Sequence, residues 1–187
     1  MPRAGVTPER IESVAAEVVD HEGWDTLTLS AVASQLGVSV PSLYKHVDGM
    51  AAVRRRVTVR AVMQMADRLT TAAVGRAGSD ALGPIAQAYR SFAVEHPGQY
   101  AATIVAPAAD DEEHLAASGR VLMPVLAMIA GYGVPADRSI DAARFIRSTL
   151  HGFVSLQLAG GFGLPDDVEA SFDRTVAAID RALSTWE

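Results

Sequence analysis

The chain has 187 residues, of which 49% are hydrophobic and 20% charged, and it contains no cysteine. This composition predicts a packed globular protein and excludes disulfide bridges and cysteine-based metal or redox sites. The net charge of −6 argues at first against nucleic-acid binding, but residues 61–187 carry the whole deficit and residues 1–60 are balanced. Residues 39–60 even carry five basic groups against one acidic group. Because charges more than about 10 Å apart are largely screened in physiological salt, a locally basic end can still meet a phosphate backbone.

The N-terminal residues turn polar at once and contain no apolar signal core. The apolar stretch at 121–129 is interrupted by Pro124 and is too short to cross a bilayer. We therefore expect a cytoplasmic protein with no membrane partner.

Nearly every segment places apolar residues at helical spacing, and no segment alternates long enough to predict a strand. The first helix has a clear start, because Thr7 can cap it and Pro8 suits its first position. The predicted fold class is all-α. The expected helices span about residues 8–22, 28–36, 40–47, 50–71, 80–95, 99–106, 110–130, 137–159 and 166–185.

Residues 29–47 match the pattern of a helix-turn-helix, two short helices that cross at a tight turn. Ala33 supplies the small residue that close approach needs, and Gly37 can adopt the positive φ of the turn. Apolar residues flank this corner, and Ser39 can cap the second helix. The outward face of that helix offers polar and apolar groups suited to a DNA major groove. Such corners also occur in bundles that bind no DNA.

Two blocks carry a family resemblance: Gly-Trp-Asp-Thr-Leu-Thr-Leu at 23–29 and Leu-Gly-Val-Ser-Val-Pro-Ser-Leu-Tyr-Lys-His-Val at 36–47. With them, roughly the first fifty residues resemble the tetracycline-repressor (TetR) family of transcription regulators. The resemblance implies an N-terminal three-helix helix-turn-helix DNA-binding domain, residues 1–48. A long helix would join it to a helical ligand-binding and dimerisation domain, residues 49–187. The stretch 150–160, Leu-His-Gly-Phe-Val-Ser-Leu-Gln-Leu-Ala-Gly, resembles the subgroup with a His-Gly (WHG-type) C-terminal ligand domain.

The resemblance also implies which residues contact DNA. The family usually has a lysine near the start of the fourth helix to hold a phosphate, whereas this chain has Asp48, Gly49 and Met50 there. Arg54 or Arg55, one turn further on, can take that role. The implied contacts on the second and third helices are Thr28, Ser30, Val40, Pro41, Ser42, Tyr44, Lys45 and His46.

The last two predicted helices are more apolar than one internal face requires, which favours a homodimer formed by a four-helix bundle. Two recognition helices about 34 Å apart would then meet successive major grooves of a palindromic operator. The alternative is that these residues are all intrachain core. The predicted interface residues are Leu150, Phe153, Val154, Leu156, Leu158, Phe172, Val176, Ile179 and Leu183.

An inducer, a small molecule that the sequence does not identify, is expected to bind between helices of the larger domain and to release a repressor from DNA. Arg90, His96 and Gln157 are candidate polar contacts for it. Each apolar candidate can equally be plain core. These candidates for the ligand-binding cavity are Met63, Tyr89, Phe92, Tyr100, Met123, Phe145 and His151.

Nothing in the sequence supports catalysis. The glycines of 160–163 follow a helix and lead to Pro165, so they do not form a phosphate-binding loop, and there is no nucleophile elbow or zinc motif. His114 follows four acidic residues, which are more typical of a helix start than of a metal site. We predict no enzyme, cofactor or metal. The alternative function is a helical small-molecule-binding or interaction module without DNA-binding activity, which the sequence at 48–50 leaves open.

Overall fold

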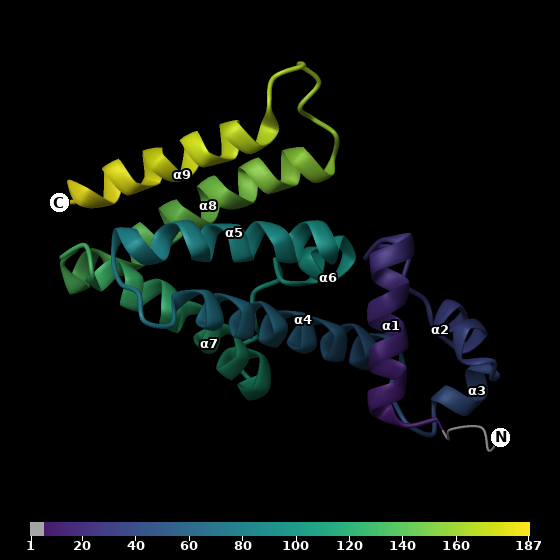
Figure 1. Ribbon diagram of the computed structural model, residues 1–187. Helices are drawn as coiled ribbons and strands as arrows, with labels where there is room; N and C mark the ends of the chain where they lie inside the picture. Colours follow the sequence, from purple (N-terminus) through teal and green to yellow (C-terminus); the bar gives the residue numbers. More distant parts are fainter. Residues whose placement is uncertain (1–5) are drawn as a thin grey trace. The chain divides into compact units, whose positions relative to one another are not determined.

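The structure is a computed structural model that describes residues 6–187, and Figure 1 shows an all-α chain. No strand occurs among these residues, which confirms the predicted fold class. The helices are α1 (Pro8–Glu22), α2 (Leu29–Leu36), α3 (Val40–Leu43), α4 (Gly49–Ala73), α5 (Ser79–Glu95), α6 (Pro97–Ala102), α7 (Glu112–Ala130), the short 3-10 helix η1 (Ala136–Arg138), α8 (Ser139–Leu158) and α9 (Val168–Ser184).

The chain folds into two compact units, which are described separately. Unit 1 comprises the described residues up to Val62 together with His96–Leu115, and unit 2 comprises Met63–Glu95 together with Ala116–Glu187. Helices α4 and α7 each contribute residues to both units. The boundary expected between residues 48 and 49 separates a DNA-binding domain from a ligand-binding and dimerisation domain, and it stays a prediction.

Helix α1 begins as the sequence predicts. The Thr7 hydroxyl oxygen accepts a hydrogen bond from the Arg10 N–H at 3.2 Å, and Pro8 occupies the first turn, where no N–H is needed. Its apolar face is buried in the core of unit 1 with residues of α2, α3 and α4. The buried residues of α1 are Ile11, Val14, Ala15, Ala16, Val18 and Val19.

The C-terminal part of α1 also binds α6. The Asp20 carboxylate accepts hydrogen bonds from the backbone N–H of Gln99 at 2.9 Å and from its side-chain amide at 2.6 Å, and it lies 2.9 Å from Nδ1 of His96. Gly98 packs so closely that an added Cβ would overlap the carbonyl oxygen of Val19. Residues far apart in the sequence thereby hold α6 against α1.

Several helices are shorter than the sequence suggested, among them α6 and α9. The expected helix at 99–106 ends at Ala102, because the N–H groups of Thr103 and Ile104 bond three residues back and tighten the turn. Pro107 then disfavours helical backbone in the residue before it. The C-terminal helix begins two residues later than expected, where Asp167 caps it by accepting the Glu169 N–H at 2.9 Å.

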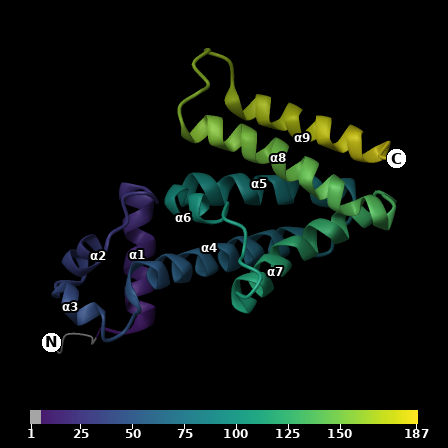
Figure 2. The same cartoon turned by 180° about the vertical axis from the view of Figure 1, so that it is seen from behind.

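In unit 2, α5 packs against both α8 and α9, and the last two helices lie side by side in Figures 1 and 2. Large apolar side chains from all three helices are buried here, among them Phe92, Ile146, Val154, Phe172 and Ile179. Amphipathic faces at helical spacing account for this core.

Two turns of unit 2 meet through their backbones: residues 74–78, between α4 and α5, and residues 131–135, between α7 and η1. Gly78 has a φ of +54°, and an added Cβ there would lie 2.9 Å from the carbonyl oxygen of Gly131. Beside this contact, the Tyr132 hydroxyl donates a hydrogen bond of 2.5 Å to the Asp180 carboxylate of α9. That bond lowers the pKa of Asp180, while burial raises the pKa of Tyr132.

Within residues 6–187, no helix combines the length and apolar character that crossing a membrane requires. The same residues contain no group of three or more His, Asp or Glu side chains arranged to hold a metal ion.

Candidate functional site

The predicted helix-turn-helix corner is present in unit 1. Gly37 ends α2 in the left-handed conformation, with φ 69° and ψ 33°. The next N–H, of Val38, bonds back to the Ala33 carbonyl at 3.0 Å, so that positive φ closes the helix end. Val32 and Ala33 are buried in the core with Leu43 of α3. The corner is therefore built by the residue types that the sequence indicated.

The second helix of the corner is shorter than predicted. Helix α3 ends at Leu43, not near Val47, and the chain continues in tight turns in which the N–H groups of His46 and Val47 share the Leu43 carbonyl. The predicted cap is also different, because the Ser39 hydroxyl lies 2.9 Å from the Ser42 hydroxyl and does not bond the helix N–H groups. Tyr44, Lys45 and His46 thus lie on a turn that follows α3.

The turn after α3 carries three exposed residues among the predicted DNA contacts. Tyr44 is 59% exposed although it is a large aromatic residue, and Lys45 and His46 beside it are also exposed. The chain has no other lysine than Lys45. An exposed aromatic ring next to a cation is a surface suited to base edges and phosphates.

The remaining predicted contacts on α2 and α3 are more varied. The Thr28 hydroxyl caps α2 by accepting the Ala31 N–H at 3.1 Å, but the residue stays exposed, as does Ser30. Pro41 is exposed and Ser42 half-buried. Val40 packs partly against the core, so only part of its side chain is available to a ligand.

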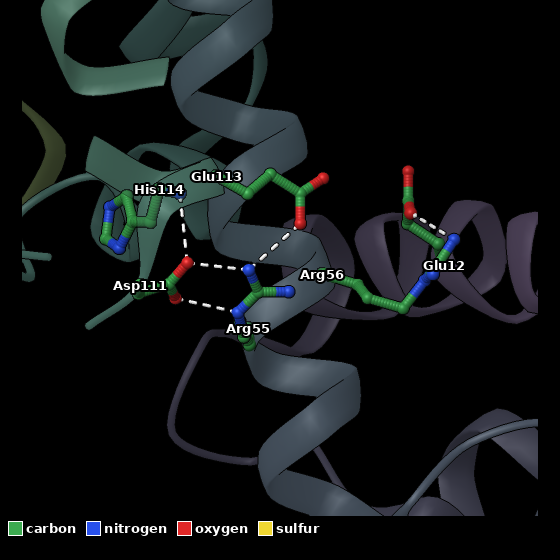
Figure 3. A network of polar contacts seen from close by, with 6 residues as sticks. All are labelled: Glu12, Arg55, Arg56, Asp111, Glu113 and His114. Carbon is green, nitrogen blue, oxygen red and sulfur yellow. Dashed lines mark hydrogen bonds and ion pairs between the residues drawn. The ribbon is translucent and has the colours of Figure 1, made fainter. Parts of the chain in front are cut away.

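The arginines at the start of α4 are engaged within unit 1. The Arg54 guanidinium lies 5.3 Å from the Trp24 ring centre and donates to the Asp25 carbonyl at 3.4 Å. Arg56 lies 3.0 Å from the Glu12 carboxylate (Figure 3). Sequence reasoning named Arg54 and Arg55 as candidate phosphate contacts and missed the acidic partners of Arg55 and Arg56.

Arg55 is held most firmly of the three. Its Nε and Nη2 donate to the two oxygens of Asp111 at 2.7 and 2.6 Å, and Nη2 also lies 2.9 Å from Glu113 (Figure 3). This bidentate bond raises the pKa of Arg55 and lowers that of Asp111 to about 2, an effect to which the His114 N–H also contributes. With Asp110 and Glu112, these acidic residues line an open hollow of about 750 Å³ beside Arg55.

The predicted ligand-binding residues do not share one environment. Tyr100 is buried in unit 1, whereas the other candidates belong to unit 2. There, Phe92 is buried with the Arg68 guanidinium 5.4 Å from its ring, Met123 is exposed, and Phe145 packs on Trp186 at 5.3 Å.

The other candidates of unit 2 are partly buried. Arg120 lies 3.7 Å from the Met63 sulfur, and Tyr89 is half-buried on α5. Burial, with a smaller contribution from Arg147, lowers the pKa of His151, which favours a neutral ring at neutral pH. An open hollow of about 470 Å³ in unit 2 is lined by Asp67, Arg68, Thr71, Ala72 and Ala88, none of which was predicted. The ligand-binding set stays a prediction.

The predicted dimer residues divide into two groups. Leu156 and Leu158 are 52% and 39% exposed, and Phe153 and Val176 are half-buried. The others are buried inside the chain, where they offer no direct surface to a second copy. These buried residues are Leu150, Val154, Phe172, Ile179 and Leu183.

One polar cluster of unit 2 was only partly foreseen. Arg90 of α5 is buried, and its Nε donates to Gln157 of α8 at 2.9 Å while its Nη1 donates to Glu169 of α9 at 2.6 Å. Sequence reasoning named Arg90 and Gln157 but missed Glu169. The available signal was the position of Arg90 on the buried face of α5, between Ala86 and Ala93 at helical spacing.

Comparison with known proteins places this geometry in a family. Residues 11–63 match the family of bacterial regulatory proteins, tetR family, and residues 82–179 match the tetracyclin repressor-like C-terminal domain. The chain belongs to the TetR family. It is a helix-turn-helix transcriptional regulator, and the alternative of a module without DNA-binding activity is not favoured. The match does not test the His-Gly subgroup.

Three relatives of this TetR-family regulator illustrate the likeness. It is 40% identical to the uncharacterized HTH-type transcriptional regulator Rv0681 of Mycobacterium tuberculosis over 89% of this chain and 75% of that protein. It is 31% identical to the uncharacterized HTH-type transcriptional regulator YobS of Bacillus subtilis over 94% of this chain and 91% of that protein. In structure it resembles the TetR-family protein ActR of Streptomyces coelicolor in complex with (S)-DNPA, with a TM-score of 0.66 and 15% identity over 96% and 98% of the chains.

Proposed function

We propose that this TetR-family regulator is a cytoplasmic, homodimeric repressor that binds a palindromic operator and is released by a small-molecule inducer. The observation that carries the proposal is the exposed turn Tyr44-Lys45-His46, held at the end of a helix-turn-helix whose corner is closed by Gly37. The DNA that such a turn reads lies in the bacterial cytoplasm. We expect no catalytic activity, and the relatives named above are regulators.

For the DNA contacts, we propose that Tyr44, Lys45 and His46 enter the major groove, with Pro41 and Ser42 beside them. Thr28 and Ser30 at the start of α2 contact the phosphate backbone, as exposed hydroxyl groups commonly do. Val40 contributes an apolar contact through the part of its side chain that stays accessible.

Of the arginines of α4, Arg54 is the better candidate for a phosphate. Its partners are neutral, the Trp24 ring and the Asp25 carbonyl, so its charge remains available. Arg55 is already neutralised by Asp111 and Glu113 and has to leave both before it can bind DNA. We therefore expect Arg54 to contribute more affinity than Arg55.

For regulation, we propose that unit 2 holds both the inducer and the dimer contacts. ActR was crystallised in complex with (S)-DNPA, which supports a ligand-responsive function for a protein of this fold. An inducer that binds better to the arrangement unable to span both half-sites would shift the population away from DNA. The exposed side chains of Leu156 and Leu158 are the proposed centre of the dimer contact.

The DNA-binding proposal can be tested on sequences selected by the protein from a random duplex library. We expect a palindromic consensus and a steep loss of affinity with added salt, because Lys and Arg release counterions from phosphates. Lys45→Ala should weaken binding by roughly tenfold or more and reduce the salt slope by about two, one for each copy in the dimer. Arg144→Ala, which removes an exposed arginine of α8, is the matched control and should change neither.

The single lysine allows a second measurement. A lysine-directed acylating reagent can modify only Lys45 and the terminal amine, so mass spectrometry can follow Lys45 alone. The selected duplex should protect Lys45 from acylation. Equal acylation of Lys45 with and without DNA, under conditions in which the complex forms, would show that this turn does not face the duplex.

A further inference from the structure

Arg90 of unit 2 forms an ion pair with Glu169, and the two side chains differ widely in their exposure to solvent. Its side chain is 7% exposed, whereas that of its acidic partner Glu169 is 57% exposed. A buried cation without a carboxylate is costly, so Arg90 needs an anion, but the anion that it has lies at the surface. Any other carboxylate that reached this surface could compete for the guanidinium.

The bond between Arg90 and Glu169 is weaker than an arginine–carboxylate pair can be, because it uses one nitrogen of the guanidinium. Among the contacts of the described residues, Glu169 meets one guanidinium nitrogen, Nη1, at 2.6 Å. By contrast, Asp111, which is 14% exposed, binds Arg55 through two nitrogens. A guanidinium can bind a carboxylate through two parallel hydrogen bonds, and Arg90 does not use this capacity toward Glu169. The Gln157 side chain fixes Nε and so orients the group.

Two aromatic rings lie near the same guanidinium. Its carbon lies 4.6 Å from the Phe172 ring centre and 6.0 Å from that of Phe153. Phe153 in turn packs on Phe162 at 4.8 Å, and Phe162 is partly exposed on the segment between α8 and α9. The rings therefore extend from the buried cation to the surface.

We propose that Arg90 is the anchor for a small carboxylate ligand with a flat apolar body, and that Glu169 occupies the carboxylate position when no ligand is bound. The ligand carboxylate binds the guanidinium in place of Glu169, and its apolar body packs on the accessible parts of Phe153 and Phe162. Glu169 lies in the first turn of α9, next to its cap Asp167, so its release changes the contacts that hold the start of this helix. The inference rests on the proposed effector role of unit 2, for which it names the chemical class of ligand.

The experiment is chemical rescue of the variant Glu169→Ala, with benzoate as the probe. Removing the carboxylate should lower the Tm, because the buried guanidinium loses its anion. Benzoate should then raise the Tm of the variant in a saturable way, with an apparent Kd about tenfold or more below that for the wild type, where Glu169 competes. The isosteric neutral compound benzamide should not do so, and acetate, which lacks the ring, should act more weakly.

The variants Arg90→Gln and Glu169→Gln complete the test. In the double variant Arg90→Gln, Glu169→Ala the benzoate effect should disappear, because the anchor is gone. Glu169→Gln keeps the shape of the side chain and serves for calorimetric titration with benzoate if the alanine variant does not fold. Equal effects of benzoate and benzamide, or equal benzoate affinity in wild type and variants, would show that the ion pair only joins α5 to α9. The assay contains no DNA, so failure of the operator experiments would contradict the proposed function and leave this result standing.

Discussion

The Asp111 carboxylate bonds both a helix end and an arginine. Its Oδ1 accepts the backbone N–H of His114 at 3.0 Å and so caps α7, while both of its oxygens accept hydrogen bonds from Arg55. The carboxylate therefore satisfies a helix end and a cation with the same atoms. Because its pKa in the folded protein is about 2, well below the usual value of about 3.9, its charge favours the folded state.

The first prediction concerns Asp111→Asn. Asparagine still caps a helix, so the variant removes mainly the charge. The wild type should have the higher Tm by a constant margin above about pH 5, and the margin should shrink as the pH falls from about 4 toward about 2, because a depressed pKa stabilises only while the carboxylate is ionised. Thermal unfolding of both proteins across this range measures it. Glu113→Gln, which removes an exposed partner of Arg55, should shift the Tm less, and a margin independent of pH would contradict the prediction.

At the scale of elements, the attachment of α6 to α1 depends on close backbone approach. Gly98 brings the first turn of α6 onto the Val19 carbonyl, and Asp20 fixes the same turn through Gln99 and His96. Each contact joins α1 to a segment about eighty residues further along the chain. Contacts of this kind depend on backbone groups and polar side chains, so they leave little trace in the hydrophobic pattern of the sequence.

The second prediction follows from this contact. Gly98→Ala should lower the free energy of unfolding by about 2 kcal/mol or more, because the methyl group overlaps a backbone oxygen that cannot move independently of α1. Gly119→Ala is the matched control, since its Cβ would meet no atom within 4 Å and alanine favours a helix over glycine by about 1 kcal/mol. Denaturant titrations should therefore shift in opposite directions for the two variants. A shift in the same direction would contradict the close approach.

These elements also show what the sequence can predict. Helices α1 and α2 were recognisable because their caps and apolar faces lie within a few residues, and Gly37 was recognisable because its turn needs a positive φ. The end of α3 at Leu43 was not, because three-residue hydrogen bonds leave no pattern of side chains. The partners of Arg55 and Arg90 are 56 and 79 residues away, which no local spacing reveals. Apolar periodicity likewise cannot distinguish Val154, in the core, from Leu156, at the surface.

At the scale of the whole molecule, the uneven charge and the exposed apolar residues of α8 support a dimeric DNA-binding protein. The acidic surplus lies entirely beyond residue 60, so residues 1–60, which contain the helix-turn-helix, carry no net charge that would repel phosphates. Two copies are needed to contact two half-sites of a palindrome.

The third prediction tests that assembly. The double variant Leu156→Glu, Leu158→Glu should be monomeric at concentrations at which the wild type is dimeric, because it places charges at two exposed apolar side chains of α8. Its operator affinity should fall by roughly a hundredfold or more, since each half-site then binds alone. Light scattering after size exclusion measures the mass. Met123→Glu alters another exposed apolar residue, on α7, and should stay dimeric, whereas a dimeric double variant would place the contact elsewhere.

The meeting of Gly78 and Gly131 limits how this protein can diverge. The atoms that would collide belong to the main chain, which every amino acid carries, so a larger residue at one position cannot be compensated by a change at the other. In genetic terms, neither glycine has a suppressor at its partner. Related proteins can keep both glycines, or they can replace both turns together by insertion or deletion. Single substitutions do not lead from the first arrangement to the second.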